Sequence, residues 1–206
     1  MNSGLQSTVS GLTEVVHVFE EKRYCVIRAL ISRPIADALC RYIQNKANAG
    51  YLNNDRVPSS RYAYGDHNME KLLEKLTPIV EQACGLSLYP GYSYCRLYEH
   101  GAELARHRDR DACEISLSIN LGQDPQSPWP LWIRNSEKAY AAELFPGDAL
   151  LYRGIECEHW REPFNGSFVA QVFLHYVDKN GPYSTWKFDK RNTLNIAPGG
   201  PGRALS

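Results

Sequence analysis

The chain has 206 residues, a length that suits one domain with a substantial core. Its 23 Lys and Arg residues balance 23 Asp and Glu residues, and without a clustered basic strip this neutral charge argues against nucleic acid as a partner. The sequence has no apolar run of about 18 residues and its start lacks the pattern of a signal peptide, so we expect no membrane partner. The 6 cysteines include no CxxC pair, which favours reduced thiols and a cytoplasmic location.

The N-terminal part predicts a flexible start followed by β-structure. We expect residues 1–14 to be flexible and the single folded domain to span 15–190. The segment VVHVFEEKRYCVIRAL (15–30) is rich in β-branched and aromatic residues, which is typical of one or two strands, with a charged turn at EEK.

A helix is expected over residues 31–50. Ser32 can cap this helix, and Pro34 falls in its first turn, where proline is tolerated. Apolar residues recur at the helical spacing, so one stripe should face the core. That stripe consists of Ile35, Leu39 and Ile43.

A polar loop and a second helix should follow. Residues 51–66 are rich in turn-forming types and predict a loop. Residues 67–85 predict a helix with a kink or a join at Pro78. Its apolar stripe consists of Met69, Leu72, Leu73, Leu76, Val80 and Cys84.

From about residue 88 the hydrophobic period changes to two, which predicts strands. One predicted face carries Tyr92, Tyr94, Arg96 and Tyr98; another carries Ile115, Leu117, Ile119 and Leu121, with Ser116, Ser118 and Asn120 opposite. Further strands are expected at 131–135, 138–145, 149–154 and 166–178, before a flexible tail at 191–206. Helices followed by many short strands favour an α+β fold built on a β-sandwich or jelly roll.

The charged hexapeptide RHRDRD (106–111) lies between two of these apolar strands. In an extended stretch His107 and Asp109 point the same way, so their side chains can reach one point. A second histidine would complete a two-histidine, one-carboxylate face that suits Fe(II). His159 is the candidate, because it lies between two predicted strands. Taken alone, His107 and Asp109 could equally form a salt-bridged surface turn.

Four segments occur in an order that resembles a known family. They are YCRLYEHGAELARHRD, EISLSINLG, ELFPGDALLYRG and EHWREPFNGSFVAQVFLHYV. This order is similar to that of the 2-oxoglutarate- and Fe(II)-dependent dioxygenases, most closely the prolyl-hydroxylase-like branch, over roughly residues 88–178. The resemblance implies a double-stranded β-helix (jelly roll) flanked by N-terminal helices, with iron bound by His107, Asp109 and His159.

The resemblance also implies a reaction. Fe(II), O₂ and 2-oxoglutarate would serve to hydroxylate a C–H bond, with succinate and CO₂ as products. Related halogenases replace the carboxylate of the metal face with a small residue, so Asp109 favours hydroxylation or another oxidative outcome. The substrate would be a small molecule, an amino acid or a peptidyl residue, and neither its identity nor the oligomeric state follows from the sequence.

The site for the far carboxylate of 2-oxoglutarate departs from the family pattern. In the prolyl-hydroxylase-like branch a Lys or Arg follows the distal histidine by some ten residues, but here NGSFVAQV (165–172) contains no cation. Arg161 is the candidate substitute because an extended segment places it on the face of His159; Arg96 and Arg134 are the alternatives. By the resemblance, Tyr98 and Ser118 would also contact the cosubstrate.

Substrate contacts are expected from aromatic and arginine side chains near the mouth of the barrel. The candidates are Tyr94, Trp132, Arg134, Tyr64 and Arg61. Each of them also suits packing or surface roles, because a β-rich fold uses many aromatic residues in its core. His175 has no partner pattern and is interpreted as structural or solvated.

Two other functions use the same metal face. A non-catalytic, cupin-type metal-binding or sensor module would need no anchor for 2-oxoglutarate. A zinc-dependent hydrolase would need a general base near the metal, for which Glu114 and Glu158 are candidates.

Overall fold

The computed structural model describes residues 16–136 and 138–195. Residues 16–22 are helical. After them, the described residues form two α-helices, eleven strands and two 3₁₀-helices. In chain order they are β1 (Tyr24–Ile27), α2 (Arg33–Asn48), β2 (Asn53–Asn54), β3 (Ser60–Tyr64), α3 (His67–Cys84), β4 (Leu88–Glu99), β5 (Leu104–His107), the 3₁₀-helix η1 (Asp111–Cys113), β6 (Ile115–Asp124), β7 (Leu131–Arg134), β8 (Ala139–Ala142), β9 (Ala149–Tyr152), β10 (Glu158–Arg161), β11 (Phe168–Asp178) and the 3₁₀-helix η2 (Ser184–Lys190).

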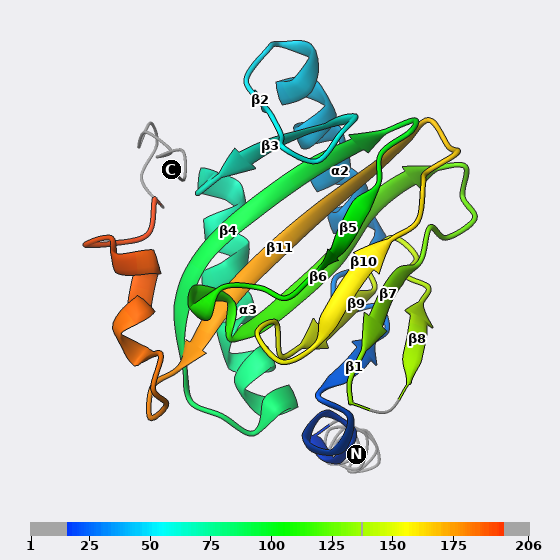
Figure 1. The fold of residues 1–206 in the computed structure, drawn as a ribbon. Helices are drawn as coiled ribbons and strands as arrows, with labels where there is room; N and C mark the ends of the chain where they lie inside the picture. The colour runs from blue at the N-terminus through cyan, green and yellow to red at the C-terminus, as the bar shows by residue number, and fades with distance from the viewer. Residues whose placement is uncertain (1–15, 137, 196–206) are drawn as a thin grey trace, which may run out of the picture.

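Two antiparallel sheets face each other (Figure 1). The larger sheet has seven strands in the order β1-β9-β6-β11-β4-β3-β2, and the smaller has four in the order β5-β10-β7-β8. Strands distant in sequence are therefore neighbours in each sheet, as in a double-stranded β-helix. The predicted α+β fold with a jelly-roll core is confirmed.

Helices α2 and α3 cover the outer face of the larger sheet (Figure 1). The apolar residues of β6 pack there: Ile115, Leu117, Ile119 and Leu121 are each 0% exposed and belong to the same core as both helices. Asp66 caps α3 by accepting hydrogen bonds from the backbone N–H groups of Asn68 and Met69. This layer fixes the sheet against the helices and leaves the opposite face of the sheet for the smaller sheet.

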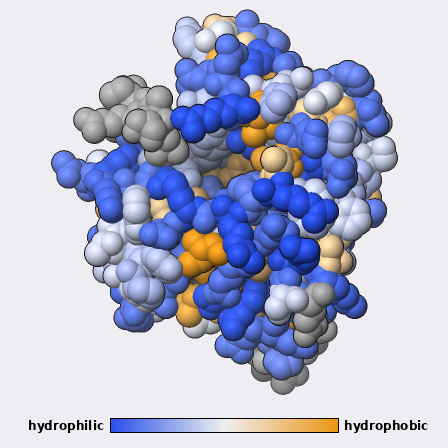
Figure 2. Space-filling view, in the orientation of Figure 1, coloured by the Kyte–Doolittle hydropathy of each residue, from blue (hydrophilic) through white to orange (hydrophobic). Residues whose placement is uncertain are grey.

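The inner face of the larger sheet carries polar and aromatic side chains. Ser116, Ser118 and Asn120 alternate with the apolar residues of β6 as predicted, and all three are buried. From β4, Tyr92, Tyr94 and Arg96 point into the same space. The space-filling view shows a hollow on this side of the molecule, bordered mainly by hydrophilic residues (Figure 2).

Two parts of the N-terminal region differ from the prediction. Residues 16–22, expected to be strand with a charged turn at 20–22, are helical, with Phe19 fully buried against the core, so packing outweighs intrinsic propensity. Within the described part of 15–30 the strand is Tyr24–Ile27. The expected loop at 51–66 contains β2 and β3, and β3 pairs with β4 along five residues.

Helix α2 is placed correctly, and its predicted stripe is borne out in part: Ile43 is fully buried and Leu39 packs partly buried against the core. Ile35 is 49% exposed, and the buried residues are Ala36, Cys40, Ile43 and Ala47. Small residues are needed here because helix and sheet approach closely: a Cβ on Gly122 of β6 would lie 2.5 Å from the Cys40 Sγ. Ser32 occupies the N-cap without a side-chain cap hydrogen bond.

Helix α3 runs continuously through Pro78 and ends at Gly85, which has a left-handed φ of 71°. Residues 191–195, which the sequence assigns to a tail, contact this helix, since Leu194 is buried and Arg191 donates to Glu70 at 2.6 Å. The stretches 1–15 and 196–206, which include the remaining predicted flexible residues, lie outside the described ranges. Within those ranges, no helix has the length and apolar character to cross a membrane.

Candidate metal centre

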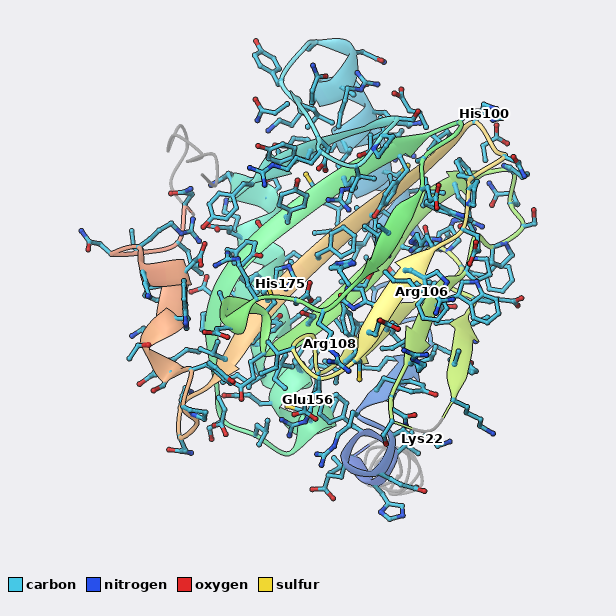
Figure 3. The ribbon with its side chains drawn as sticks, viewed as in Figure 1. Lys22, His100, Arg106, Arg108, Glu156 and His175 are labelled. Atoms are coloured by element: carbon cyan, nitrogen blue, oxygen red, sulfur yellow. The ribbon has the colours of Figure 1, made fainter. Side chains whose placement is uncertain are left out.

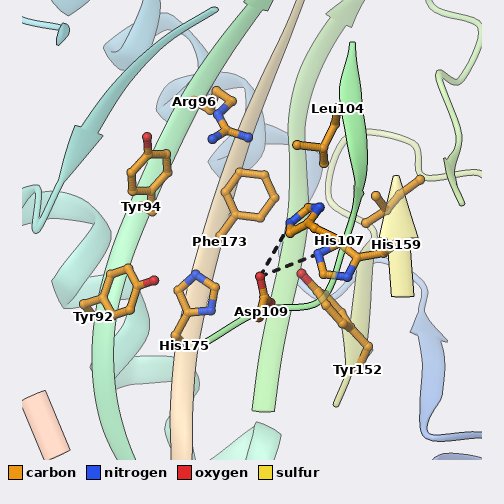
Figure 4. Close-up of a pocket in the computed structure, with 11 residues that line it drawn as sticks. Tyr92, Tyr94, Arg96, Leu104, His107, Asp109, Tyr152, His159, Phe173 and His175 are labelled. Atoms are coloured by element: carbon orange, nitrogen blue, oxygen red, sulfur yellow. Dashed lines mark ion pairs between the residues drawn. The ribbon is translucent and has the colours of Figure 1, made fainter. Parts of the chain in front are cut away.

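His107, Asp109 and His159 come together at one point between the two sheets. His107 on β5 and His159 on β10 are cross-strand partners, and their ring centroids lie 4.2 Å apart. The Nε2 atom of each histidine lies 3.7 Å from the Asp109 Oδ1. One ligand atom from each of the three residues fits within a group 4.8 Å across (Figure 4). The grouping that the sequence predicts therefore exists in the fold.

Backbone carbonyl groups orient both imidazoles. The Nδ1 atom lies 2.9 Å from the Ala105 carbonyl oxygen in His107 and 3.1 Å from the Cys157 carbonyl oxygen in His159. An Nδ1–H that donates to a carbonyl leaves Nε2 unprotonated, which is the form that binds a metal ion. Burial lowers the pKa of His159 below its ordinary value, which also favours the neutral ring.

Asp109 is held from behind by its neighbours. The Ser116 hydroxyl lies 3.2 Å from the Asp109 Oδ2, and the Asp109 backbone N–H donates to the Gly154 carbonyl at 2.9 Å. A Cβ on Gly154 would collide with the Asp109 Oδ2 and the Cys113 carbonyl oxygen, so only glycine permits this approach. The carboxylate is thus fixed with Oδ1 toward the two histidines.

A second group, Asp109, Cys113 and His175, also has metal-ligating atoms within 4.8 Å. It fits a metal ion less well, because the Cys113 Sγ lies 3.1 Å from the Tyr92 hydroxyl and burial raises the pKa of this thiol. The His175 Nδ1 lies 2.9 Å from the Ser116 Oγ. The donor set of His107, Asp109 and His159 is the one that matches a two-histidine, one-carboxylate face.

The three residues lie on the wall of a cavity of about 210 Å³ between the sheets. The end of the cavity that carries these three residues, the metal end, is completed by Tyr152 and His175. Tyr92, Tyr94 and Phe173 form an aromatic wall, and the remaining lining residues are Arg96, Leu104 and Leu131 (Figure 4). The cavity can therefore hold a small ligand or one side chain in contact with the metal end.

The three candidate arginines have different surroundings. Arg134 pairs with Glu158 at 2.7 Å and is half exposed, while Arg96 lines the cavity but pairs with Asp55 at 2.7 Å. Arg161 is 2% exposed, and among the described residues it has no carboxylate partner. It donates to the Trp129 carbonyl and to the Gln171 side chain, and its Nε has no partner in the part of the chain that the structure describes.

Burial lowers the pKa of Arg161 to about 10, so the guanidinium still carries its charge at neutral pH. An uncompensated buried cation is costly, and a ligand carboxylate would relieve this cost. Arg161 does not line the cavity, but its cross-strand partner Leu104 does, so the guanidinium lies close behind that wall.

Ser118 and Tyr98 are buried near these arginines. Ser118 accepts a hydrogen bond from Gln171 at 2.7 Å, and Gln171 in turn accepts from Arg161 at 3.1 Å. The Tyr98 hydroxyl accepts from Arg96 at 2.9 Å. Both predicted residues are thus connected to an arginine by hydrogen bonds.

Among the predicted substrate residues, Tyr94 lines the cavity and donates to Asp55 at 2.9 Å. Tyr64 is buried behind Tyr92, with ring centroids 5.0 Å apart, and donates to Asp189 at 2.6 Å. Tyr94 therefore stays a substrate candidate, whereas Tyr64 supports the aromatic wall from behind.

Trp132, Arg134 and Arg61 point away from the cavity, contrary to the prediction. Trp132 and Arg134 pair in register with Trp160 and Glu158, which alternate with His159 and so face outward. Leu131 is the residue of β7 that lines the cavity. A one-residue error in strand register reverses the face of every side chain.

Arg61 pairs in register with Leu97, on the helix-covered face of the larger sheet. There it donates to Glu99 at 2.6 Å. The two candidate bases of a hydrolase are also absent from the cavity wall: Glu114 accepts from the Asp178 backbone N–H, and Glu158 pairs with Arg134.

Sequence reasoning missed several residues of the cavity region, among them Gln171, Tyr152 and His175. Gln171 and His175 alternate with apolar residues along β11, so period-two spacing could have placed both on the inner face. Figure 3 shows His175 on β11 among the strands, in contrast to the exposed Arg106 and Arg108. Nothing in the sequence alone indicates that β11 lies beside the metal end.

No family model and no curated protein sequence matches the chain. Solved structures do match. A prolyl-4-hydroxylase from Pseudomonas putida is 18% identical, with a TM-score of 0.68, over 81% of this chain and 98% of that one. A prolyl hydroxylase from Trichoplax adhaerens, in complex with a hypoxia inducible factor oxygen degradation domain peptide fragment, is 15% identical, with a TM-score of 0.71, over 87% and 94%.

A third match is the non-heme alpha ketoglutarate dependent epimerase SnoN from nogalamycin biosynthesis, which is 12% identical, with a TM-score of 0.72, over 96% of both chains. Another structure of SnoN is a complex with Fe³⁺, alpha ketoglutarate and nogalamycin RO. At these identities the likeness establishes the fold. The chain has the jelly-roll fold of 2-oxoglutarate- and Fe(II)-dependent oxygenases, and the similarity to prolyl hydroxylases is confirmed at that level.

Proposed function

We propose that this chain is an Fe(II)- and 2-oxoglutarate-dependent dioxygenase that hydroxylates a C–H bond and releases succinate and CO₂. The observation that carries the proposal is the convergence of two Nε2 atoms and one carboxylate oxygen on the wall of a cavity. Nitrogen and oxygen donors on one side of a metal ion, with the other side open, suit Fe(II). The fold shared with iron and 2-oxoglutarate enzymes supports the same conclusion by analogy.

In this proposal His107, Asp109 and His159 hold the iron. Fe(II) and 2-oxoglutarate together supply the activation of O₂ and the oxidising power. The chain contributes fixed geometry: carbonyl oxygens orient both histidines, and Ser116 orients Asp109. Tyr152, 2% exposed with its ring 4.9 Å from that of His159, keeps water from one side of the metal end.

Arg161 is the proposed anchor for the far carboxylate of 2-oxoglutarate. It lies two residues beyond His159 on an extended strand, roughly 6.5–7 Å along the chain direction, and it has no carboxylate partner among the described residues. Gln171 and Ser118 extend a hydrogen-bonded row from it. A charge-assisted pair with a ligand carboxylate would offset the cost of burying this guanidinium.

The substrate is proposed to be a small molecule, an amino acid or a peptidyl residue. A cavity of about 210 Å³ encloses a group of that size, and Tyr92, Tyr94 and Phe173 provide aromatic surface beside the metal end. The Trichoplax prolyl hydroxylase was solved with a peptide and SnoN with nogalamycin RO, so this fold accommodates both kinds of ligand. A cytoplasmic location stays a prediction, with the six cysteines all free and buried.

The test is an anaerobic titration of the metal-free protein with Fe(II) and then 2-oxoglutarate. We expect the visible metal-to-ligand charge-transfer band that marks chelation of iron by the 2-oxo acid, and no band in Asp109→Ala. Asp111→Asn, an exposed acid two residues away, is the matched control and should keep the band. Iron binding without a band would favour the cupin-type metal-binding or sensor module instead.

A further inference from the structure

His175 lies beside the candidate metal centre but is not one of its three proposed ligands. This histidine of β11 is 6% exposed and lines the cavity beside Asp109. Its ring packs against Tyr92, with centroids 4.5 Å apart. A buried imidazole beside a reactive centre needs a hydrogen-bond partner for each ring nitrogen or a ligand that supplies one.

One ring nitrogen of His175 is held by a hydrogen-bonded row. The His175 Nδ1 lies 2.9 Å from the Ser116 Oγ, and the Ser116 Oγ lies 3.2 Å from the Asp109 Oδ2. The serine has one proton, and besides the His175 Nδ1 it can go to the Asp109 carboxylate or to the Cys113 carbonyl oxygen, also 3.2 Å away; the bond to the carboxylate is the stronger, charge-assisted one. Ser116 must then accept from His175, so Nδ1 carries the ring proton.

The opposite orientation satisfies fewer groups. If Ser116 donated to the His175 Nδ1, the Asp109 Oδ2 would lose the hydroxyl donor within its reach. The row from His175 through Ser116 to Asp109 therefore fixes a tautomer in which Nε2 is an acceptor. No residue in the described ranges donates to this atom. In Figure 4 the ring stands between Tyr92 and Asp109, with a nitrogen turned toward the space enclosed by Tyr94 and Phe173.

We propose that His175 is a substrate-positioning residue whose Nε2 accepts a hydrogen bond from an O–H or N–H group of the substrate. The proposal rests on the proposed oxygenase function only in taking the cavity as the substrate site. Arg96, the cation on the cavity wall, is compensated by Asp55, so the wall offers no free charge to an ionic substrate. The substrate class is therefore a neutral hydroxyl or amide N–H donor adjacent to the C–H bond that reacts.

The first test is the tautomer itself. Long-range ¹H–¹⁵N correlation spectra of the metal-free and Zn(II)-loaded protein report which ring nitrogen carries the proton. We expect a pyrrole-type Nδ1 and a pyridine-type Nε2 for His175, and loss of this preference in Ser116→Ala. A protonated Nε2 in the wild type would overturn the proposal without any variant having to fold.

The second test uses two matched probes, 2-pyrrolidinone and N-methyl-2-pyrrolidinone, which differ in one N–H donor. The first should move the Nε2 resonance and bind about tenfold more tightly than the second, the effect of one hydrogen bond. His175→Phe should remove the difference in affinity. The exposed His100 provides the internal control, because neither probe should move its resonances.

Equal affinity for the two probes, or no response of Nε2 to either, would contradict the assignment of His175. Neither test needs iron, 2-oxoglutarate or turnover. A protein that fails the charge-transfer titration but shows the donor preference would refute the oxygenase and keep the acceptor role of His175. The reverse result would keep the oxygenase and refute that role.

Discussion

The two faces of the seven-stranded sheet are built from the same strands but serve different purposes. On β6, Leu117 faces the helices and is 0% exposed within the apolar core, while Ser118, equally buried, faces the cavity and accepts a hydrogen bond from Gln171. On the helix-covered face the apolar side chains need only to pack closely against α2 and α3. The inner face must provide each buried polar group with a partner, and across from it, on β10 of the smaller sheet, the Arg161 Nε has none among the described residues.

This contrast predicts that substitutions of residues between the two sheets change ligand affinity and that substitutions on the helix-covered face change stability. The largest expected effect is at the metal end. Asp109→Ala removes one of three ligands and should weaken Fe(II) binding roughly 1000-fold, more than the 10–100-fold expected for an outer partner of a ligand. Anaerobic calorimetry measures the affinity. Tight iron binding by the variant would show that the three residues do not form the metal site.

Leu117→Ala tests the opposite face. The new cavity should lower the free energy of unfolding by about 2–5 kcal/mol, whereas the iron affinity of the folded protein should stay unchanged. Chemical denaturation and metal titration give the two quantities. If this variant lost iron affinity while remaining folded, the separation between the two faces would be wrong.

Two glycines sharpen the comparison, because each allows a close approach on one face. Gly154→Ala places a Cβ against the Asp109 carboxylate, and Gly122→Ala places one against Cys40 of α2. The first should weaken iron binding about tenfold or more, as loss of an outer partner does. The second should lower the melting temperature with iron affinity retained. Equal effects of both substitutions on iron affinity would contradict this account.

The smallest effect is expected at Ser118, the neighbour of Leu117. Ser118→Ala removes one hydrogen bond from the row that ends at Arg161, worth about 1 kcal/mol. The affinity for 2-oxoglutarate should fall about fivefold and the affinity for iron should not change. A titration of the iron-loaded protein with 2-oxoglutarate measures the first affinity. A lower iron affinity would contradict the prediction and show that the substitution disturbs the metal end.

Local patterns in the sequence predict the alternation along β6 and the shared direction of His107 and Asp109, whereas the complete metal face with His159 is implied by the family resemblance. The alternation along β6 and the spacing of His107 and Asp109 depend only on which way successive side chains point on a strand. Features that depend on pairing between distant strands were not accessible. The sequence places Trp132 near the cavity mouth, but its register against Trp160, a tertiary property, turns it outward. Residues 60–64 have the composition of a loop, and only their pairing with β4 makes them the strand β3.

Tertiary packing also determines two features that intrinsic propensity does not predict: the helix at 16–22 and the buried residues of α2. The helix over 16–22 contains β-branched and aromatic residues, but burial of Phe19 outweighs their preference. On α2 the predicted Ile43 is buried, but where the sheet approaches closely the smaller Ala36 and Cys40 are buried in place of the exposed Ile35. His175 could be assigned to the inner face from its spacing, but its place beside Asp109 required the sheet order.

The most direct test of the central claim, that the space between the two sheets binds a 2-oxo acid between the metal site and Arg161, uses two ligands. 2-Oxoglutarate and 2-oxobutyrate share the metal-chelating end, but only the first has a far carboxylate. In the anaerobic Fe(II) protein we expect 2-oxoglutarate to bind about 10–100-fold more tightly, the value of a charge-assisted pair, and the two ligands to bind equally in Arg161→Leu. Arg134→Leu, on the outer face, should keep the difference. A preference that survives in Arg161→Leu and disappears in Arg96→Leu would contradict the account and assign the anchor to Arg96.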